Sequence, residues 1–214
     1  MLGDHIEQLS NAAAASRATS NHERRAFSGA LVPRAFVSTA SFRMMNASYF
    51  YARSLQKGRR RVEHYDGFFF PLDSLRAWNL AYGQAGFYQL QFVVESTCAR
   101  QALRDVIDLF RRYDIASFVS VLKTFGDRHS GGILSFPRPG VTLAVDVRND
   151  GEKTDRFLTE CHALIDHYRA GVYLAKDAVQ PAKSFERFYG PALERFSEQR
   201  DRGIASDQSR RLGM

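Results

Sequence analysis

A lysine stands inside an otherwise apolar stretch, in the segment VYLAKD at residues 172–177. Burial disfavours the charged form of a lysine and lowers its pKa, so a lysine in such a stretch needs an acidic partner or a chemical task. The neighbouring Asp177 could supply the partner, in which case Lys176 forms only an ion pair at the end of a strand. The stretch itself does not decide between the two readings.

Other polar residues interrupt strands that are otherwise apolar. Gln89 and Gln91 alternate on one face of a strand, and Lys123 precedes Phe125 by two residues in another. Thr142, Asp146 and Tyr173 complete the set. If these faces converge, amide, hydroxyl and ammonium groups line a cavity suited to a polyhydroxylated or anionic ligand. The alternative, which the pattern alone favours, is that these faces simply meet solvent, as one side of an antiparallel sheet often does.

The elements that must position these residues follow a regular order. Alternation of apolar residues predicts a strand at 86–95, and apolar residues at helical spacing predict a helix at 96–114. The same signals continue with strands at 115–126 and 132–147, a helix at 154–171 and a strand at 172–176. This is the split βαβ order of a ferredoxin-like α+β domain, an antiparallel sheet with helices on one face. A C-terminal helical segment at 184–200 follows.

Composition narrows the class of protein. The chain has 214 residues, of which 44% are hydrophobic and 13% aromatic, as a folded globular protein requires. No apolar run reaches the roughly 18–20 residues that span a bilayer, and the N-terminus has no signal-peptide pattern, so we expect a cytoplasmic location. The two cysteines and the spacing of the histidines predict neither a disulfide scaffold nor a metal site.

Positive charge is concentrated in the first part of the chain. The formal net charge of +7 lies entirely within residues 1–61, and residues 62–214 are balanced. Such a segment suits phosphate-bearing partners or an anionic membrane surface, but an exposed linker explains it equally well. The predicted strands lack the aromatic RNA-binding pattern, and KGRRR at 57–61 has no interleaved aromatic residues. A nucleic-acid partner is therefore not expected, although a non-enzymatic nucleic-acid-binding module remains an alternative.

Several segments, in order and spacing, carry a resemblance to a known family. They are FFFPLDSLRAWNLAYGQAGFYQLQFVV, VLKTFG, LSFPRPGVTLAVDV, GVYLAKD and SDQSRRLG. Together they resemble the C-terminal part of the FAD-linked sugar oxidoreductases of the vanillyl-alcohol-oxidase superfamily, over about residues 66–214. The resemblance implies a basic, weakly structured leader with part of a cap domain at 1–65, a substrate (cap) domain at 66–170, and a segment at 171–214 that returns to a flavin domain.

The resemblance also implies a chemistry and a set of site residues. Lys176 matches the family lysine beside the flavin ring and the substrate hydroxyl, which makes it the expected catalytic residue, with Tyr173 close by. The implied reaction is hydride transfer from a sugar carbinol carbon to flavin N5, with the ammonium group stabilising charge that develops on the flavin. The implied substrate is a sugar or a polyprenyl-phosphoryl sugar, the alternative being an aldonolactone of the D-arabinono-1,4-lactone type. The implied substrate-binding residues are Gln89, Gln91, Lys123, Phe125, Thr142 and Tyr173.

Among the departures of the sequence from the family, two bear on its function. Thr142 stands where members often have Asn, which leaves the sugar undetermined. No glycine-rich phosphate loop or attachment residue for the flavin is found, so we expect FAD to be bound mainly by a domain missing from this chain. The partner would be a separate FAD-binding subunit, and the leader suits a peripheral membrane contact. A truncated remnant without activity is the remaining alternative.

Overall fold

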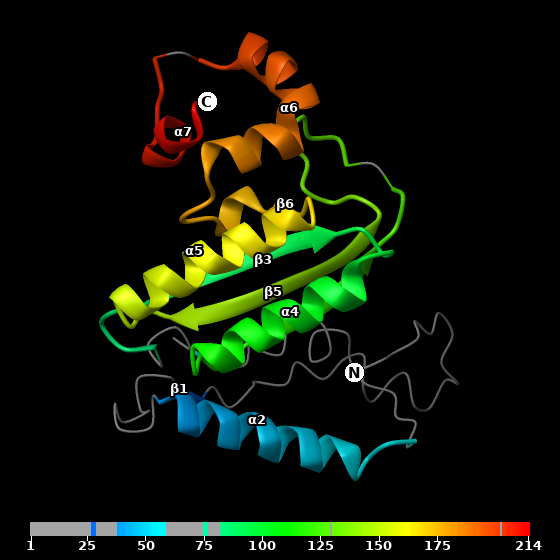
Figure 1. The fold of residues 1–214 in the computed structure, drawn as a ribbon, viewed down its shortest axis with the longest axis vertical. Coiled ribbons are helices and arrows are strands. Elements are labelled where there is room, and N and C mark those ends of the chain that lie inside the picture. Colours follow the sequence, from blue (N-terminus) through cyan, green and yellow to red (C-terminus); the bar gives the residue numbers. More distant parts are fainter. Residues whose placement is uncertain (1–26, 29–37, 59–74, 77–81, 129, 202) are drawn as a thin grey trace, which may run out of the picture. The chain divides into compact units, whose positions relative to one another are not determined.

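The computed structural model describes residues 27–28, 38–58, 75–76, 82–128, 130–201 and 203–214 (Figure 1). The chain divides into two compact units, one formed by Met1–Val37 with Ala47–Gly83 and the other by Ser38–Asn46 with Gln84–Met214. All the candidate site residues lie in the second unit. The predicted domain boundary after residue 65 lies outside the described residues, and the one after residue 170 stays a prediction.

In the first unit, the described residues form two short strands and part of a helix. Strands β1 (Phe27–Ser28) and β2 (Leu75–Arg76) pair in parallel. Helix α2 (Thr39–Ser54) begins in the second unit, where the buried ring of Phe42 lies 5.5 Å from the ring of Phe118.

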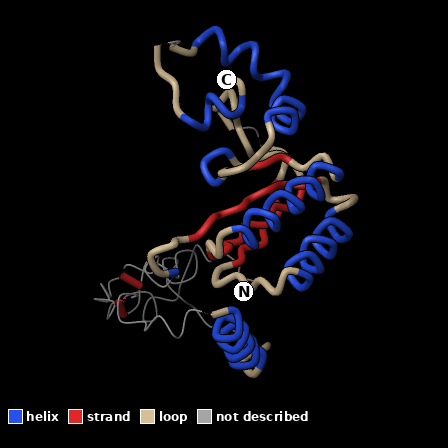
Figure 2. Tube along the Cα trace, turned by 60° about the vertical axis from the view of Figure 1, so that its left-hand side comes forward, coloured by secondary structure: helices blue, strands red, loops and turns tan. Residues whose placement is uncertain are grey.

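The second unit is built on a four-stranded antiparallel sheet. Its elements are β3 (Phe87–Val94), α4 (Ala99–Arg112), β4 (Ser120–Phe125), β5 (Gly140–Arg148), α5 (Glu152–His167) and β6 (Gly171–Val172). The strand order is β4-β5-β3-β6, and each neighbouring pair is antiparallel. Both helices lie on the same face of the sheet (Figures 1 and 2). The predicted ferredoxin-like α+β fold is therefore confirmed.

One hydrophobic core lies between the sheet and the two helices. Strand β3 directs Leu90, Phe92 and Val94 toward the helices, and all three are buried. Helix α4 meets them with Ala102, Val106 and Leu109, and α5 with Phe157, Cys161 and Ile165. Each fully buried large aliphatic or aromatic side chain stabilises the fold by about 1.5–3 kcal/mol, so this core fixes the sheet on which the candidate residues stand.

The last strand of the sheet is shorter than its sequence predicts. The strand expected at 172–176 consists of Gly171–Val172 alone, and a 3-10 turn, η5 (Leu174–Lys176), follows. The Tyr173 amide still donates to the Gln91 carbonyl oxygen at 2.8 Å, after which the Lys176 amide turns back to the Tyr173 carbonyl oxygen at 2.9 Å. The prediction that Lys176 belongs to a strand is thus wrong, because the chain leaves the sheet edge before that residue.

Strand β5 also begins later than expected. The predicted strand started at residue 132, whereas β5 starts at Gly140. Pro137 and Pro139 have no amide hydrogen to give to a ladder, which keeps the preceding segment out of the sheet.

The C-terminal helical segment is present as two helices, α6 (Ala182–Gln199) and α7 (Asp207–Leu212). They share a second small core in which Phe185, Tyr189 and Leu212 are buried. Among the helices in the described part of the chain, none has the length and apolar character that crossing a membrane requires.

Candidate functional site

The face of the sheet opposite α4 and α5 carries the polar residues singled out in the sequence. Gln89 lies directly opposite Asp146 in the β3–β5 register, and Thr142 of β5 lies opposite both Val93 and Lys123. Directly opposite residues of an antiparallel pair project to the same side. This face therefore holds Gln89, Gln91, Lys123, Phe125, Thr142 and Asp146, and we call it the polar face.

Hydrogen bonds orient the two glutamines of the polar face. The Gln89 amide nitrogen Nε2 donates to Asp146 Oδ1 at 2.9 Å, and Gln91 Nε2 donates to Thr142 Oγ1 at 3.2 Å. Thr142 and Asp146 are almost fully buried. Each glutamine side chain keeps its carbonyl oxygen and a second N–H for another partner. Buried Thr142 thus acts on Gln91 in this structure, and its predicted contact with substrate stays a prediction.

An aromatic row crosses one end of the polar face. The ring centroid of Phe136 lies 5.9 Å from that of Phe125 and 5.0 Å from that of Tyr173. Phe136 is buried and connects the two predicted site residues, although its role was not predicted. Its place in the segment FPRPG, immediately before a proline, was the available signal.

A hollow of about 250 Å³ lies at the outer edge of β3. It is lined by Phe87, Tyr88 and Gln89 on one side and by Ala175, Lys176, Asp177 and Ala178 on the other. It exists because β6 pairs with β3 only at Phe92 and Val93, so no strand covers the first residues of β3 on this side. The hollow brings Lys176 and Gln89 together, although 87 positions separate them in the sequence.

Lys176 has no side-chain hydrogen bond or ion pair within the described part of the chain, and it is half-buried. The alternative in which Asp177 is its partner is wrong, because Asp177 Oδ2 accepts from Arg211 Nη2 at 2.7 Å. The Lys176 ammonium group therefore remains available to a group that enters the hollow.

The other predicted residues lie away from the hollow. Lys123 is exposed on β4, two strands from β3 and level with Val93, four residues along β3 from Gln89. Phe125 is still nearer the end of the sheet, opposite Gly140. The structure thus places the predicted residues on one face but gathers only Gln89 and Lys176 around one hollow. The binding and catalytic roles remain predictions.

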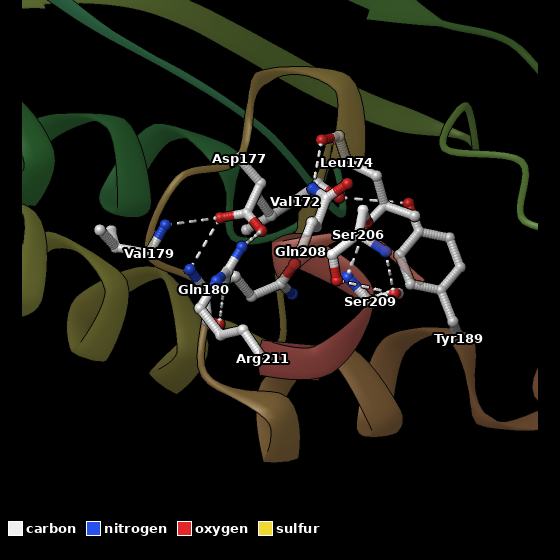
Figure 3. A network of polar contacts seen from close by, with 10 residues as sticks. All are labelled: Val172, Leu174, Asp177, Val179, Gln180, Tyr189, Ser206, Gln208, Ser209 and Arg211. Atoms are coloured by element: carbon white, nitrogen blue, oxygen red, sulfur yellow. Dashed lines mark hydrogen bonds and ion pairs between the residues drawn. The ribbon is translucent and has the colours of Figure 1, made fainter. Parts of the chain in front are cut away.

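Polar groups not predicted as site residues hold the Lys176 turn from behind. Figure 3 shows Arg211 of α7 reaching to Asp177 and to the carbonyl oxygen of Gln180. His162 of α5 is buried near Asp177 and Arg211, and burial is the main reason that its pKa lies below the usual value. Burial also raises the pKa of the neighbouring Cys161 thiol to about 12, which keeps it protonated and unsuited to act as a nucleophile.

No family model matches the chain. Over 159 residues it is 35% identical to the decaprenylphosphoryl-beta-D-ribose oxidase of Mycolicibacterium smegmatis. The predicted resemblance is confirmed. The match covers 72% of this chain and 34% of that oxidase, so the chain spans about a third of the relative's length. This partial coverage is consistent with a C-terminal portion.

Proposed function

We propose that this chain supplies the substrate-binding portion of an FAD-linked oxidoreductase that oxidises a sugar hydroxyl. The observation that carries the proposal is the meeting of Lys176 and Gln89 at one hollow. The similarity to an oxidase of a ribose derivative supports the same class of reaction. Both side chains can still bind a ligand, because the Lys176 ammonium group and the Gln89 carbonyl oxygen have no hydrogen-bond partner among the described residues.

The groups at the hollow suit a sugar. A sugar hydroxyl both donates and accepts hydrogen bonds, so it can donate to the Gln89 side-chain oxygen and accept from the Lys176 ammonium group. Asp146 holds the Gln89 amide in place, which avoids the entropic cost of ordering it when the substrate arrives. The exposed ammonium of Lys123 would attract a phosphate farther along the polar face.

The same hollow would also receive one edge of a flavin. FAD supplies the hydride acceptor when it is bound. The Lys176 ammonium group can donate to acceptor oxygens of the ring and favours negative charge beside it. A volume of about 250 Å³ lies below the roughly 300–1,000 Å³ of sites that enclose a drug-sized ligand, so it cannot enclose a dinucleotide. Most of the FAD would be bound by another domain or subunit.

A chimaera tests the proposal. The segment of the M. smegmatis oxidase that matches this chain is replaced by the corresponding residues of this chain, and its flavin content and substrate oxidation are measured. We expect oxidation with prenylphosphoryl-ribose, and D-arabinono-1,4-lactone tests the alternative substrate class. Lys176→Met in the chimaera should lower kcat about 100-fold or more, because the developing charge loses its stabilising partner, while the flavin content should stay the same because most of the FAD is bound elsewhere.

Lys183→Met is the matched control. Lys183 is an exposed lysine on α6, seven residues farther along, and its replacement should leave kcat unchanged. A chimaera that retains flavin but oxidises neither substrate would contradict the proposed function. Full turnover by the Lys176→Met chimaera would remove Lys176 from the mechanism.

A further inference from the structure

The turn that carries Lys176 is not held by the sheet. Strand β6 ends at Val172, and the backbone amides of the turn that follows donate only locally, from Lys176 to the Tyr173 carbonyl oxygen and from Asp177 to the Leu174 carbonyl oxygen. Isolated turns with so few bonds open readily. Something outside the turn must therefore fix the direction of the Lys176 side chain.

The Asp177 carboxylate is the first part of that support. Its side chain is completely buried, and Oδ1 accepts from the amides of Val179 at 3.0 Å and Gln180 at 2.7 Å. Its other oxygen, Oδ2, accepts from Arg211 at 2.7 Å. A buried carboxylate needs such complete pairing, so removing the arginine would leave an uncompensated charge inside the turn.

Helix α7 is the second part. Arg211 also donates to the Gln180 carbonyl oxygen, and Gln208 Nε2 donates to the Leu174 carbonyl oxygen at 2.7 Å (Figure 3). Residues 208 and 211 are three positions apart and so lie on one face of the helix. This face therefore contacts the chain both before and after Lys176.

Helix α7 is itself well fixed. Ser206 and Ser209 form a capping box at its start, and Gly213, with a φ of 73°, ends it in the left-handed conformation that glycine adopts without strain. Leu212 anchors it in the small core with Phe185 and Tyr189. The helix is thus a rigid support that can impose its position on the turn.

We propose that Arg211 is a positioning residue for Lys176: by pairing with Asp177 and the Gln180 carbonyl oxygen, it fixes the turn that directs the Lys176 ammonium group into the hollow. The consequence for catalysis rests on the proposed function, whereas the positioning itself does not. Arginine is suited to this place because its planar group donates to two acceptors at once, which an ammonium group does less well.

The test uses the full chain with Arg211→Gln and two readouts. Amide hydrogen exchange measures opening of residues 174–180, and acetylation by sulfo-N-hydroxysuccinimidyl acetate, followed by peptide mass spectrometry, measures the reactivity of Lys176 with Lys183 as internal reference. We expect the Val179 and Gln180 amides to exchange at least about tenfold faster and the Lys176 acetylation rate to change at least about threefold. Arg211→Lys keeps the charge, so it should restore part of the amide protection and bring the Lys176 acetylation rate part of the way back.

The neighbouring residue provides the matched control. Arg210 pairs with Asp207 on the exposed side of α7, away from the turn, so Arg210→Gln should change neither readout. Amides of β3 and α4 should keep their protection in every variant, which shows that the fold persists. If Arg211→Gln does not fold, Gln208→Ala removes only the bond to Leu174 and should speed exchange of the Asp177 amide about threefold.

Unchanged exchange and acetylation in both Arg211→Gln and Gln208→Ala would overturn the proposal. In the chimaera, Arg211→Gln should lower kcat about tenfold with little change in KM, and Arg211→Lys should recover part of it. If the Lys176→Met chimaera keeps full activity while Arg211→Gln still loosens the turn, the proposed function fails and the positioning role stands. The two hypotheses can therefore fail separately.

Discussion

The side chain that supports the Lys176 turn is more buried and better paired than the lysine that lines the hollow. Asp177 has its side chain fully buried and paired, while Lys176 is half-buried with no partner in the described part of the chain. This contrast is typical of a site whose support is rigid and whose reactive group is kept available. His162 is buried close enough to Asp177 and Arg211 to interact electrostatically with both.

The burial of His162 predicts a dependence of stability on pH. Its pKa in the folded chain is lowered below about 6.5, the value for an unfolded chain, chiefly by burial. Between the lowered folded pKa and about pH 6.5, the unfolded chain binds more protons at this residue, so acidification favours unfolding. The free energy of unfolding should decrease from pH 7 toward pH 5, by up to about 1.4 kcal/mol per pH unit from this residue.

Urea denaturation at pH 7.5, 6.5 and 5.5 measures this contribution. In the His162→Gln variant, the free energy of unfolding should decrease less on acidification than in the unaltered chain. His167→Gln, at the exposed end of the same helix, should leave this decrease unchanged. Equal pH dependence in the His162→Gln variant and the unaltered chain would show that His162 is not the group responsible.

At the scale of elements, the pairing of β3 with β5 depends on the first residue of β5. Gly140 has a φ of 153°, and a Cβ atom there would lie 2.2 Å from the carbonyl oxygen of Val94. That oxygen belongs to the backbone at the end of β3, so it cannot move without disturbing the ladder. We expect Gly140→Ala to lower the free energy of unfolding by about 2 kcal/mol or more, measured by urea denaturation.

Gly126→Ala is the control for that substitution. Gly126 directly follows β4, and a Cβ atom there would have no atom within 4 Å. This variant should change the stability by less than about 1 kcal/mol. If the two alanine variants were equally stable, the close approach at Gly140 would not constrain the sheet.

The same elements show how far the sequence predicts the fold. Alternation in β3 and the apolar faces of α4 and α5 were sufficient for the βαββαβ order, because these elements bury their faces in one core. The limits of β5 and β6 were missed. Two prolines delay β5, and β6 ends at Val172, ahead of the turn whose Asp177 pairs with a residue 34 positions away. Such a long-range contact leaves no local pattern.

The candidate site was predictable to a similar degree. Period-two alternation predicted correctly that Gln89 and Gln91 share one face of their strand, whereas the register that puts Thr142 on the same face was visible only in the structure. The ion pair expected between Lys176 and Asp177 was wrong, because adjacency in sequence says little about side-chain direction after a turn. Arg211 was not predicted, as its partners became clear only once α7 was placed.

At the scale of the whole molecule, the N-terminal part of the chain differs from the remainder in net charge. The net charge of +7 comes from residues 1–61, and the remainder is balanced. The chain also spans about a third of the related oxidase's length. Electrostatic attraction to anionic surfaces should therefore come from the basic segment and not from the domain that carries the hollow.

Cosedimentation with vesicles that contain anionic lipid, at 50 and 200 mM salt, tests whether the basic segment binds anionic surfaces. Replacing Arg59, Arg60 and Arg61 with glutamine should weaken binding at 50 mM salt at least about tenfold, since each basic residue near an anionic surface contributes about 1 kcal/mol. The control replaces three exposed arginines of the balanced part, Arg100, Arg104 and Arg195, and changes the net charge equally. If both triple variants lose the same affinity, total charge governs binding and not the basic segment.

If binding to single-stranded RNA were retained at 200 mM salt, the expectation of no nucleic-acid partner would be wrong, because electrostatic contacts alone weaken steeply over that range.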